Sequence, residues 1–446
     1  MKLDKEKIKK GIIKFLKEPL LYLIIIVAIL QGVIYTNTAE IGRTGDTEGY
    51  LHSYDNGSIF KGFISDVRPP VYPYFIKTIK KIGGEENLER NVAIAQKILF
   101  FITLILFYCT LKLLIKNRII LCILTLIFGI APSVVIWNSF IITEALTGLE
   151  IMVLAFITIK YLKKPSKLLG ALTGLVIITM ILTKPAFIYI IPIYLLFVIL
   201  RWFLNKDERK KLFFAIGSVL LCCVILIMYC MKIKTGYGVF GVTSVSNINT
   251  MLTIIYSGAY NEKPDEPVSM TIKEATQGQP TEAETYEIYF NNVAPKYSLS
   301  ELQEYSKKMV NTKTYIEFII NRFVSVGNAN IGVTYDNGNN SANGSMYNFR
   351  SLNGLVLPIT FGFVYIILLA SIIYLIWYLI KYKKIDWICA FFTSMIFANI
   401  FTLIVGAPFE EQRLFFPSVC LVLLYLGVIV DKIKLKEEIL LNEKNV

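Results

Sequence analysis

Five charged residues in this largely hydrophobic chain have the side-chain types needed to act on a phosphate-bearing substrate. Two are acids, Asp46 and Glu144, and three are bases, Arg68, Lys184 and Arg413. Basic side chains hold phosphate through charge-assisted hydrogen bonds. A carboxylate can orient an incoming hydroxyl or take its proton. The set therefore suits substitution at an anionic lipid carrier, with the acids in catalysis and the bases on the carrier phosphate.

The densest polar stretch runs from Gly45 to Phe75 and contains two of these five residues. It also holds the only histidine, His52, together with Glu48 and Tyr72. A long polar connection between membrane spans is seldom mere linkage. We expect Glu48, His52 and Tyr72 to support the site. For His52 the choices are a second proton shuttle or a structural role, which is commoner for a lone histidine beside tyrosines.

The composition is that of a polytopic membrane protein. Of the 446 residues, 55% are hydrophobic, and long apolar runs recur along the chain. Soluble proteins do not have this pattern. The net charge of +13 comes from lysines in short patches between apolar runs. Cytoplasmic loops collect positive charge in this way, so we expect no nucleic-acid partner. All seven cysteines lie in apolar runs and indicate neither zinc sites nor disulfides.

The apolar runs predict an all-α protein with about ten membrane helices and both termini in the cytoplasm. Residues 1–231 form an N-terminal membrane module, and its large first outer loop, 36–92, carries the polar stretch. Residues 232–353 form a second extracytoplasmic region. Residues 354–446 hold the last membrane helices and a cytoplasmic tail. Both polar regions are assigned to the outside because every short loop on the other side is basic.

The predicted fourth span, Ser139 to Tyr161, places Glu144 about one to two turns inside its outer end. An ionisable group within a span costs a few kcal/mol, so Glu144 needs a partner or a wet cavity. The alternative to a catalytic role is a structural ion pair. The nearly uncharged stretch 168–204 is too long for one span, which predicts an outer turn at Lys184-Pro185.

Three of the five charged residues have simpler interpretations when taken alone. Lys184 and Arg413 could be interfacial residues whose charged ends reach water. Asp46 could be a helix cap within a loop. The predicted topology places all five at one membrane face, and this gathering favours a site.

Four sequence motifs occur in an order that resembles the GT-C superfamily of membrane glycosyltransferases. The nearest branch is that of the protein mannosyltransferases and aminoarabinose transferases. The motifs are GDTEGYL, RPPVYPYF, NSFIITEAL and LTKPAFIYIIP, with a weaker match at QRLFFP. The resemblance implies a GT-C-like fold, a polyprenyl-phosphate sugar donor, an active site outside the membrane and inversion at the anomeric carbon.

The resemblance also implies roles for individual residues. The acid of the first loop, here Asp46, is the catalytic base or its organiser. The base before the paired prolines, Arg68, contacts the carrier phosphate. The acid after a threonine at the head of a span, Glu144, supplies a second carboxylate. The Thr-Lys pair of the family falls on Thr183 and Lys184.

The leading hypothesis is a glycosyltransferase that transfers a hexosyl or pentosyl group to an extracytoplasmic lipid, glycan or protein. Glu48 lies two residues after Asp46, not adjacent to it as in the acid pairs of the protein mannosyltransferases, which puts a protein acceptor in doubt. One alternative is a surface-polysaccharide polymerase or ligase with a lipid-diphosphate donor. Another is a transporter of lipid-linked or anionic solutes, for which we would expect charged residues near the middle of the bilayer.

No cofactor is required by the sequence. Asp46 and Glu144 could hold a divalent cation, although their spacing does not demand one. The expected partners are the lipid bilayer, the lipid-linked donor and the acceptor. The lysine-, isoleucine- and asparagine-rich composition is typical of bacteria and predicts a location in the bacterial cell membrane.

Overall fold

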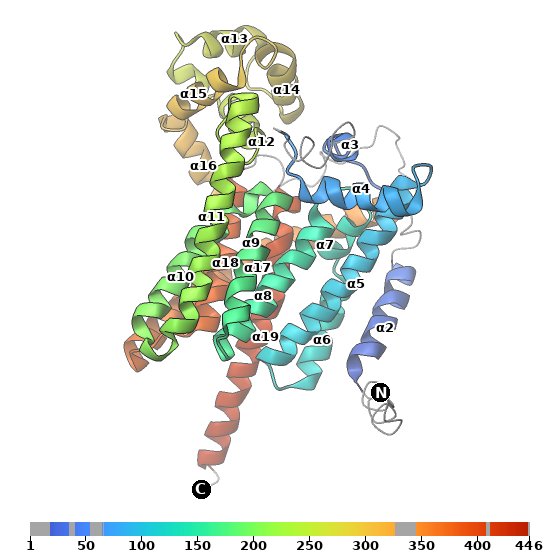
Figure 1. Ribbon diagram of the computed structural model, residues 1–446, viewed down its shortest axis with the longest axis vertical. Coiled ribbons are helices and arrows are strands. Elements are labelled where there is room, and N and C mark those ends of the chain that lie inside the picture. The colour runs from blue at the N-terminus through green and yellow to red at the C-terminus, as the bar shows by residue number, and fades with distance from the viewer. Residues whose placement is uncertain are drawn as a thin grey trace.

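The protein is described from a computed structural model (Figure 1). The structure describes residues 18–34, 41–53, 65, 67–325, 345–406 and 411–444. Parts of the two predicted outer regions lie outside this set, namely residues 36–40, 54–64 and 66 of the first and 326–344 of the second.

The described residues are almost entirely helical, and the long helices run side by side in a bundle (Figure 1). Among them, seven helices are long and apolar enough to cross a bilayer. Three are whole α-helices: Leu88–Leu114 (α5), Glu144–Lys163 (α8) and Trp387–Gly406 (α18). Two are parts of longer helices: Gly362–Tyr382 in α17 (Ser345–Tyr382) and Arg413–Lys432 in α19 (Glu411–Lys444). The other two join a short 3-10 helix to an α-helix: Pro185–Leu204 combines η2 (Pro185–Tyr189) with α10 (Ile190–Leu204), and Lys206–Tyr237 combines η3 (Lys206–Glu208) with α11 (Arg209–Tyr237). The prediction of an all-α, multi-pass membrane protein is confirmed.

Three further apolar elements stand where the other predicted spans fall. α6 (Arg118–Ile130) meets α7 and η1 (together Pro132–Asn138) at a bend of 57°. α2 (Pro19–Ile34) and α9 (Lys167–Thr183) are shorter than the seven long helices. The bend lies at Pro132, since proline can begin a helix but cannot continue one. The number of spans, ten, stays a prediction.

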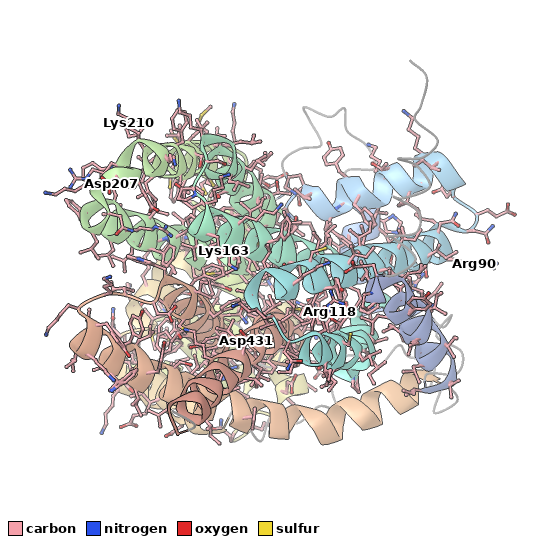
Figure 2. The ribbon with its side chains drawn as sticks, turned by 90° about the horizontal axis from the view of Figure 1, so that it is seen from below. Arg90, Arg118, Lys163, Asp207, Lys210 and Asp431 are labelled. Carbon is pink, nitrogen blue, oxygen red and sulfur yellow. The ribbon has the colours of Figure 1, made fainter. Side chains whose placement is uncertain are left out.

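The two ends of the bundle differ. α2 begins and α19 ends at the lower end in Figure 1. Figure 2 views the molecule from this end, with Arg118, Lys163 and Lys210 labelled near the ends of α6, α8 and α11. At the opposite end, α4 (Val71–Gly83) lies across the bundle beneath α3 (Thr47–His52) (Figure 1). α4 is amphipathic, and its buried face includes Tyr72 and Ile76.

Beyond α4, a small helical unit with its own core follows α11 (Figure 1). It comprises α12 (Val245–Ser257), η4 (Ala259–Glu262), α13 (Pro267–Ala275), α14 (Glu282–Glu287), η5 (Ile288–Val293), α15 (Leu299–Met309) and α16 (Lys313–Ser325). We call it the outer unit. Arg322 Nη1 donates to the Ile404 carbonyl at 2.6 Å, and Asn249 Nδ2 donates to the Gly406 carbonyl at 3.2 Å. These bonds attach the outer unit to the end of α18.

The predicted start of the fourth span at Ser139 is wrong. Glu144 is the first residue of α8 and not one to two turns inside it. The residues before it pair instead with the chain after α2. The Gly42 amide donates to the Ser139 carbonyl at 2.8 Å, and the Ile141 amide donates to the Gly42 carbonyl at 3.0 Å. Backbone groups used in this pairing cannot also make intrahelical hydrogen bonds, so the helix begins later.

Small residues let α9 and α11 approach closely. Gly170 and Gly174 lie one turn apart on α9 and face Ala215 and Ser218. Ser218 Oγ donates to the Gly170 carbonyl at 2.7 Å. A Cβ at position 174 would lie 2.4 Å from the Ser218 carbonyl oxygen. This spacing of small residues is a known way for membrane helices to pack.

Replacing Gly174 by alanine should separate the two helices and lower the melting temperature in detergent. The clash is with backbone, which cannot rotate aside, and overpacking of this kind costs about 1–3 kcal/mol. Gly217→Ala on α11 is the matched control, because a Cβ there meets nothing within 4 Å. Thermal unfolding followed by fluorescence would measure both. A Gly174→Ala protein as stable as the control would contradict the close packing.

Candidate active site

The five charged residues form one continuous chain of ion pairs, which we call the ion chain. Arg68 Nη2 lies 2.6 Å from Asp46 Oδ1, and Arg413 Nη1 lies 2.5 Å from Asp46 Oδ2. Arg413 Nε is 3.2 Å from Glu144 Oε1, and Lys184 Nζ is 2.5 Å from the same oxygen. Residues from five separate stretches of sequence are thus brought together, and Arg413 joins the two acids.

The ion chain runs from the protein interior toward the surface. The Glu144 side chain has no exposed surface, whereas that of Asp46 is 23% exposed. Lys184 and Arg413 lie between these extremes. Removing charges from water is costly unless each is paired in good geometry. The inner acid is therefore fixed by its partners, while the Asp46 end is accessible to a ligand.

Contacts between the first loop and the segment before α8 set the position of Asp46 relative to Glu144. Gly42 is required here, since a Cβ would lie 2.5 Å from the Phe140 ring. Thr47 Oγ1 donates to the Ile141 carbonyl at 3.2 Å, directly after Asp46. The chain then enters α3, whose first turn is held close to the N-terminus of α8.

The two inner cations are also fixed by their own elements. Proline disfavours helix in the residue before it, so Pro185 ends α9 at Thr183 and leaves Lys184 extended. On the other side, Asn399 Nδ2 donates to the Leu414 carbonyl at 3.1 Å, next to Arg413. Asn399 Oδ1 also accepts a hydrogen bond at 3.0 Å from Tyr189 in η2. This amide therefore joins the turn after Lys184 to the start of α19.

Arg68 is positioned from its backbone and from its side chain. The Arg68 amide donates to Ser65 Oγ at 3.2 Å. The neighbouring Val67 carbonyl accepts a hydrogen bond at 2.8 Å from Thr243, which leads into the outer unit. The segment that leads into the outer unit thus contacts the residue beside this arginine.

Gly49 and Tyr50 hold the Arg68 guanidinium and were missed by the sequence analysis. The guanidinium lies 4.5 Å from the centre of the Tyr50 ring, a cation–π contact. A Cβ on Gly49 would lie 2.8 Å from Arg68 Nε. Gly49 and Tyr50 follow Asp46 by three and four residues, the spacing of neighbours on one face of a helix. This spacing was the feature of the sequence that could have identified them.

Tyr72 is buried and supports the ion chain through a hydrogen-bond network that reaches the segment before Glu144. Its hydroxyl donates to Gln96 Oε1 at 2.6 Å, and Gln96 Nε2 donates to the Phe140 carbonyl at 2.7 Å. This buried network ties α4 and α5 to the segment that precedes Glu144. Gln96 was also missed; it stands beside Lys97 where an apolar run begins, and nothing else in the sequence marked it.

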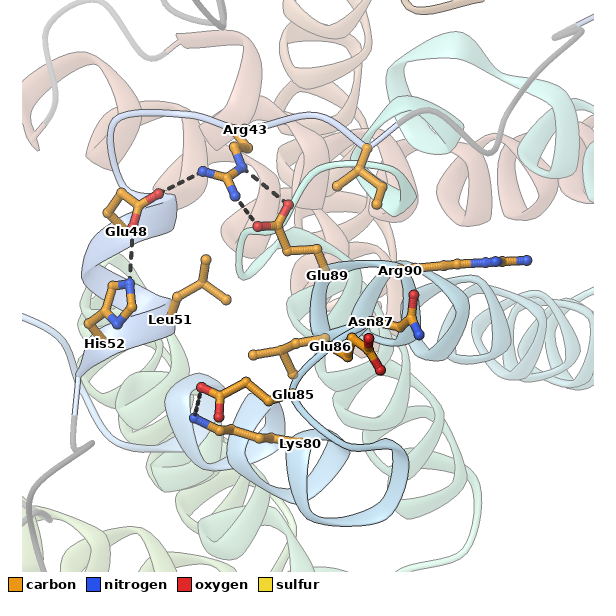
Figure 3. Close-up of a pocket in the computed structure, with 12 residues that line it drawn as sticks. Arg43, Glu48, Leu51, His52, Lys80, Glu85, Glu86, Asn87, Glu89 and Arg90 are labelled. Carbon is orange, nitrogen blue, oxygen red and sulfur yellow. Dashed lines mark hydrogen bonds and ion pairs between the residues drawn. The ribbon is translucent and has the colours of Figure 1, made fainter.

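Glu48 and His52 do not face the ion chain. They line a pocket of about 420 Å³ bounded by α3, the end of α4 and the start of α5 (Figure 3). Arg43 Nη1 lies 2.7 Å from Glu48 Oε1, and Arg43 also binds Glu89. His52 Nε2 lies 3.2 Å from Glu48 Oε2. The structure therefore places these two residues on the opposite side of α3 from the ion chain.

The pairing of Asp46 controls its acid–base character. Burial alone would raise the pKa of Asp46, but the charges and hydrogen bonds of Arg413 and Arg68 outweigh this effect. They hold the pKa of Asp46 below its ordinary value. While both arginines are bound to it, Asp46 is ionised and a weak base.

The two acids do not fit a divalent cation in this arrangement. Each carboxylate already binds two cationic side chains, and three positive groups surround the pair. No cluster of three or more histidine, cysteine, aspartate or glutamate residues suited to a metal occurs in the part of the chain that the structure describes. The charged groups of the ion chain are thus paired with one another rather than arranged around a common cation.

The ion pair of Asp46 and Arg413 should show strong energetic coupling in a double-mutant cycle. Removing one partner leaves the other charge partly buried, so Asp46→Asn and Arg413→Gln should couple by about 1–3 kcal/mol. The exposed pair Glu304 and Lys307 is the control, because surface pairs contribute about 0.2–1 kcal/mol. Unfolding free energies of the single and double variants would measure both. Additive effects at Asp46 and Arg413 would show that the pair does not interact.

Similarity to known membrane glycosyltransferases is found in both sequence and fold. Residues 67–229 match the family model described as dolichyl-phosphate-mannose-protein mannosyltransferase. Among solved structures, the chain is similar to the archaeal oligosaccharyltransferase AglB from Archaeoglobus fulgidus in complex with an inhibitory peptide and a dolichol-phosphate. The TM-score is 0.51 at 14% identity, over 95% of this chain and 52% of AglB.

This chain thus spans about half the length of AglB. No curated protein matches the sequence. The resemblance predicted from the motifs is confirmed: the chain is similar to the GT-C superfamily of membrane glycosyltransferases, in sequence over residues 67–229 and in fold over nearly its whole length.

Proposed function

We propose that the chain is a membrane glycosyltransferase that moves a sugar from a polyprenyl-phosphate donor to an acceptor outside the cytoplasm. The observation that carries this proposal is the ion chain, in which three cationic side chains surround two carboxylates at the bundle end that bears α4. The matching family model is named for dolichyl-phosphate donors, and AglB was solved with a dolichol-phosphate. Both support a lipid-phosphate donor.

Charge balance favours a monophosphate donor over a diphosphate. The ion chain has three positive and two negative groups, which leaves one net positive charge. A phosphodiester between sugar and lipid carries one negative charge and would neutralise it. A diphosphate linkage carries a further negative charge, which would stay unbalanced in a partly buried site. A polymerase or ligase that uses lipid diphosphates is thus the weaker hypothesis.

Donor binding would convert Asp46 into a better base. A phosphate that enters at the exposed end would compete with Asp46 for the guanidinium groups of Arg68 and Arg413. Once released from them, Asp46 regains basicity beside the bound sugar. Glu144 keeps Lys184 and the other edge of Arg413 in place. The site would therefore be activated by its own donor.

The transfer itself is a single displacement. The acceptor hydroxyl oxygen forms a bond to the anomeric carbon on the side opposite the phosphate. The bond from that carbon to the phosphate oxygen breaks, and its electron pair leaves with the lipid phosphate. Asp46 takes the proton of the hydroxyl. Arg68 and Arg413 stabilise the charge that develops on the phosphate, and one displacement inverts the anomeric centre.

Asp46→Asn should abolish detectable transfer and leave donor binding equal or tighter. Asparagine keeps the size of the side chain but cannot take the proton, and losing a general base costs ~10²–10⁴-fold in rate. It also removes the negative charge that competes with the donor. The measurements are sugar transfer from a purified lipid-linked donor and donor binding by the same protein.

Glu85→Gln, an exposed change on the turn after α4, is the control for loss of a carboxylate. Near-normal turnover in Asp46→Asn would place the base elsewhere, with Glu144 the next residue to test. Weaker donor binding would instead make Asp46 a structural residue of the site.

We also propose that the ion chain and the outer unit lie outside the cytoplasm of a bacterial cell, with both termini inside. Basic residues at the opposite end support this orientation, among them Arg118, Lys163 and Lys164. A lipid-linked donor would then be used at the outer face of the membrane.

Cysteine labelling in intact cells should test this orientation. In a background without native cysteines, Lys296→Cys in the outer unit should react with an impermeant reagent, because Lys296 is exposed. Lys164→Cys after α8, also exposed, should react only after permeabilisation. The reverse pattern would place the ion chain at the cytoplasmic face and exclude an extracytoplasmic acceptor.

A further inference from the structure

Glu150 is a second acid on α8 that the proposed reaction does not use. It follows Glu144 by six residues, which is about 9 Å along the helix axis at 1.5 Å per residue. It is buried, with 7% of its surface exposed. A buried ionisable residue in a membrane helix is costly unless it is paired or neutral.

The hydrogen bonds around Thr183 favour one protonation state of Glu150. Thr183 Oγ1 lies 2.6 Å from Glu150 Oε1 and 2.9 Å from the Thr179 carbonyl oxygen. A hydroxyl has one proton to donate, and a carbonyl can only accept. Both contacts are satisfied when Thr183 donates to Thr179 and Glu150 donates its own proton to Thr183. Such a donor is a protonated carboxyl.

The other oxygen of Glu150 supports the same state. Oε2 is buried and has no hydrogen-bond partner in the described part of the chain. An ionised carboxylate would share its charge with this oxygen, and a buried charge without a partner is far more costly than a buried carbonyl group.

We propose that Glu150 is a neutral carboxylic acid that positions Lys184 for the carrier phosphate. The proposal rests on the proposed function of the ion chain. Thr183, which Glu150 contacts, directly precedes Lys184, whose ammonium lies 2.5 Å from Glu144. The two acids of α8 thus bind consecutive residues at the C-terminal end of α9. Glu150 binds the side chain of the residue before the lysine, and Glu144 binds the ammonium group of the lysine itself.

Lys184 has little freedom between these two contacts. Its side chain must reach along α8 from the level of Glu150 toward Glu144, a separation of about 9 Å on the helix axis. A shift of the backbone at Thr183 and Lys184 would move the point from which this side chain reaches Glu144. Loss of the Glu150 contact should therefore displace the ammonium group, although Glu150 itself never touches the donor.

Infrared difference spectroscopy tests the protonation state without any enzyme assay. The spectrum of the wild-type protein minus that of Glu150→Gln should contain the carbonyl stretch of a protonated carboxyl. If the difference shows the bands of an ionised carboxylate instead, Glu150 is charged and the proposal is wrong. This result does not depend on whether the chain transfers sugar.

Donor binding tests the positioning role. Glu150→Gln should bind a polyprenyl-phosphate sugar within about twofold of wild type, because its amide can donate to Thr183 as the acid does. Glu150→Leu should bind about tenfold more weakly. In a Lys184→Ala background, Glu150→Leu should cause no further loss, because its effect acts through Lys184. Additive losses would make Glu150 a merely structural residue and overturn the proposal.

Thr158→Val is the matched control, since Thr158 is buried on the same helix two turns further from Glu144. Its effect should be the same with and without Lys184. If Glu150→Leu does not fold, Thr183→Val removes the same contact with an isosteric side chain and should give the same non-additive pattern. Unchanged donor binding in Lys184→Ala alone would refute the phosphate role of Lys184 while leaving the infrared result valid.

Discussion

A carboxylate with no exposed surface at the head of a membrane helix is the constraint on which this structure depends. Glu144 can remain charged there only if cations reach it, and they arrive from the end of α9 and the start of α19. The packing of α8 against both helices is therefore inseparable from the pairing of its first residue. Arg413 then extends the same set of charges outward to Asp46, so folding of the bundle also assembles the site.

The sequence analysis singled out the five charged residues that the structure brings together, because a charge in an apolar context is conspicuous and must be paired. It also predicted the break at Pro185, since proline acts on its immediate neighbour. It did not predict that α8 starts at Glu144. That boundary is set by hydrogen bonds to Gly42, about a hundred residues earlier in the chain, and local preferences do not contain such contacts.

On α3, closeness in the sequence to Asp46 did not indicate which residues lie near the ion chain. Glu48 lies two residues from Asp46, and two residues on a helix point in nearly opposite directions at 3.6 residues per turn. Glu48 and His52 therefore line the pocket shown in Figure 3, together with Arg43. Asp46, Gly49 and Tyr50 face Arg68 instead. Glu150 escaped notice for a different reason. Its partner is a hydroxyl rather than a base, and hydroxyls are common in apolar helices.

The shared use of Arg413 by two acids has a consequence for how this site can evolve. A substitution at the buried end leaves a charged side chain with almost no exposed surface and no partner, so each single substitution there would give a destabilised protein. At the Asp46 end, solvent can shield a charge that loses its partner. Under the proposed function, a change of donor preference would therefore be most accessible at the exposed end, around Asp46 and Arg68. The deep pair of Glu144 and Lys184 would be inherited unchanged across such a diversification.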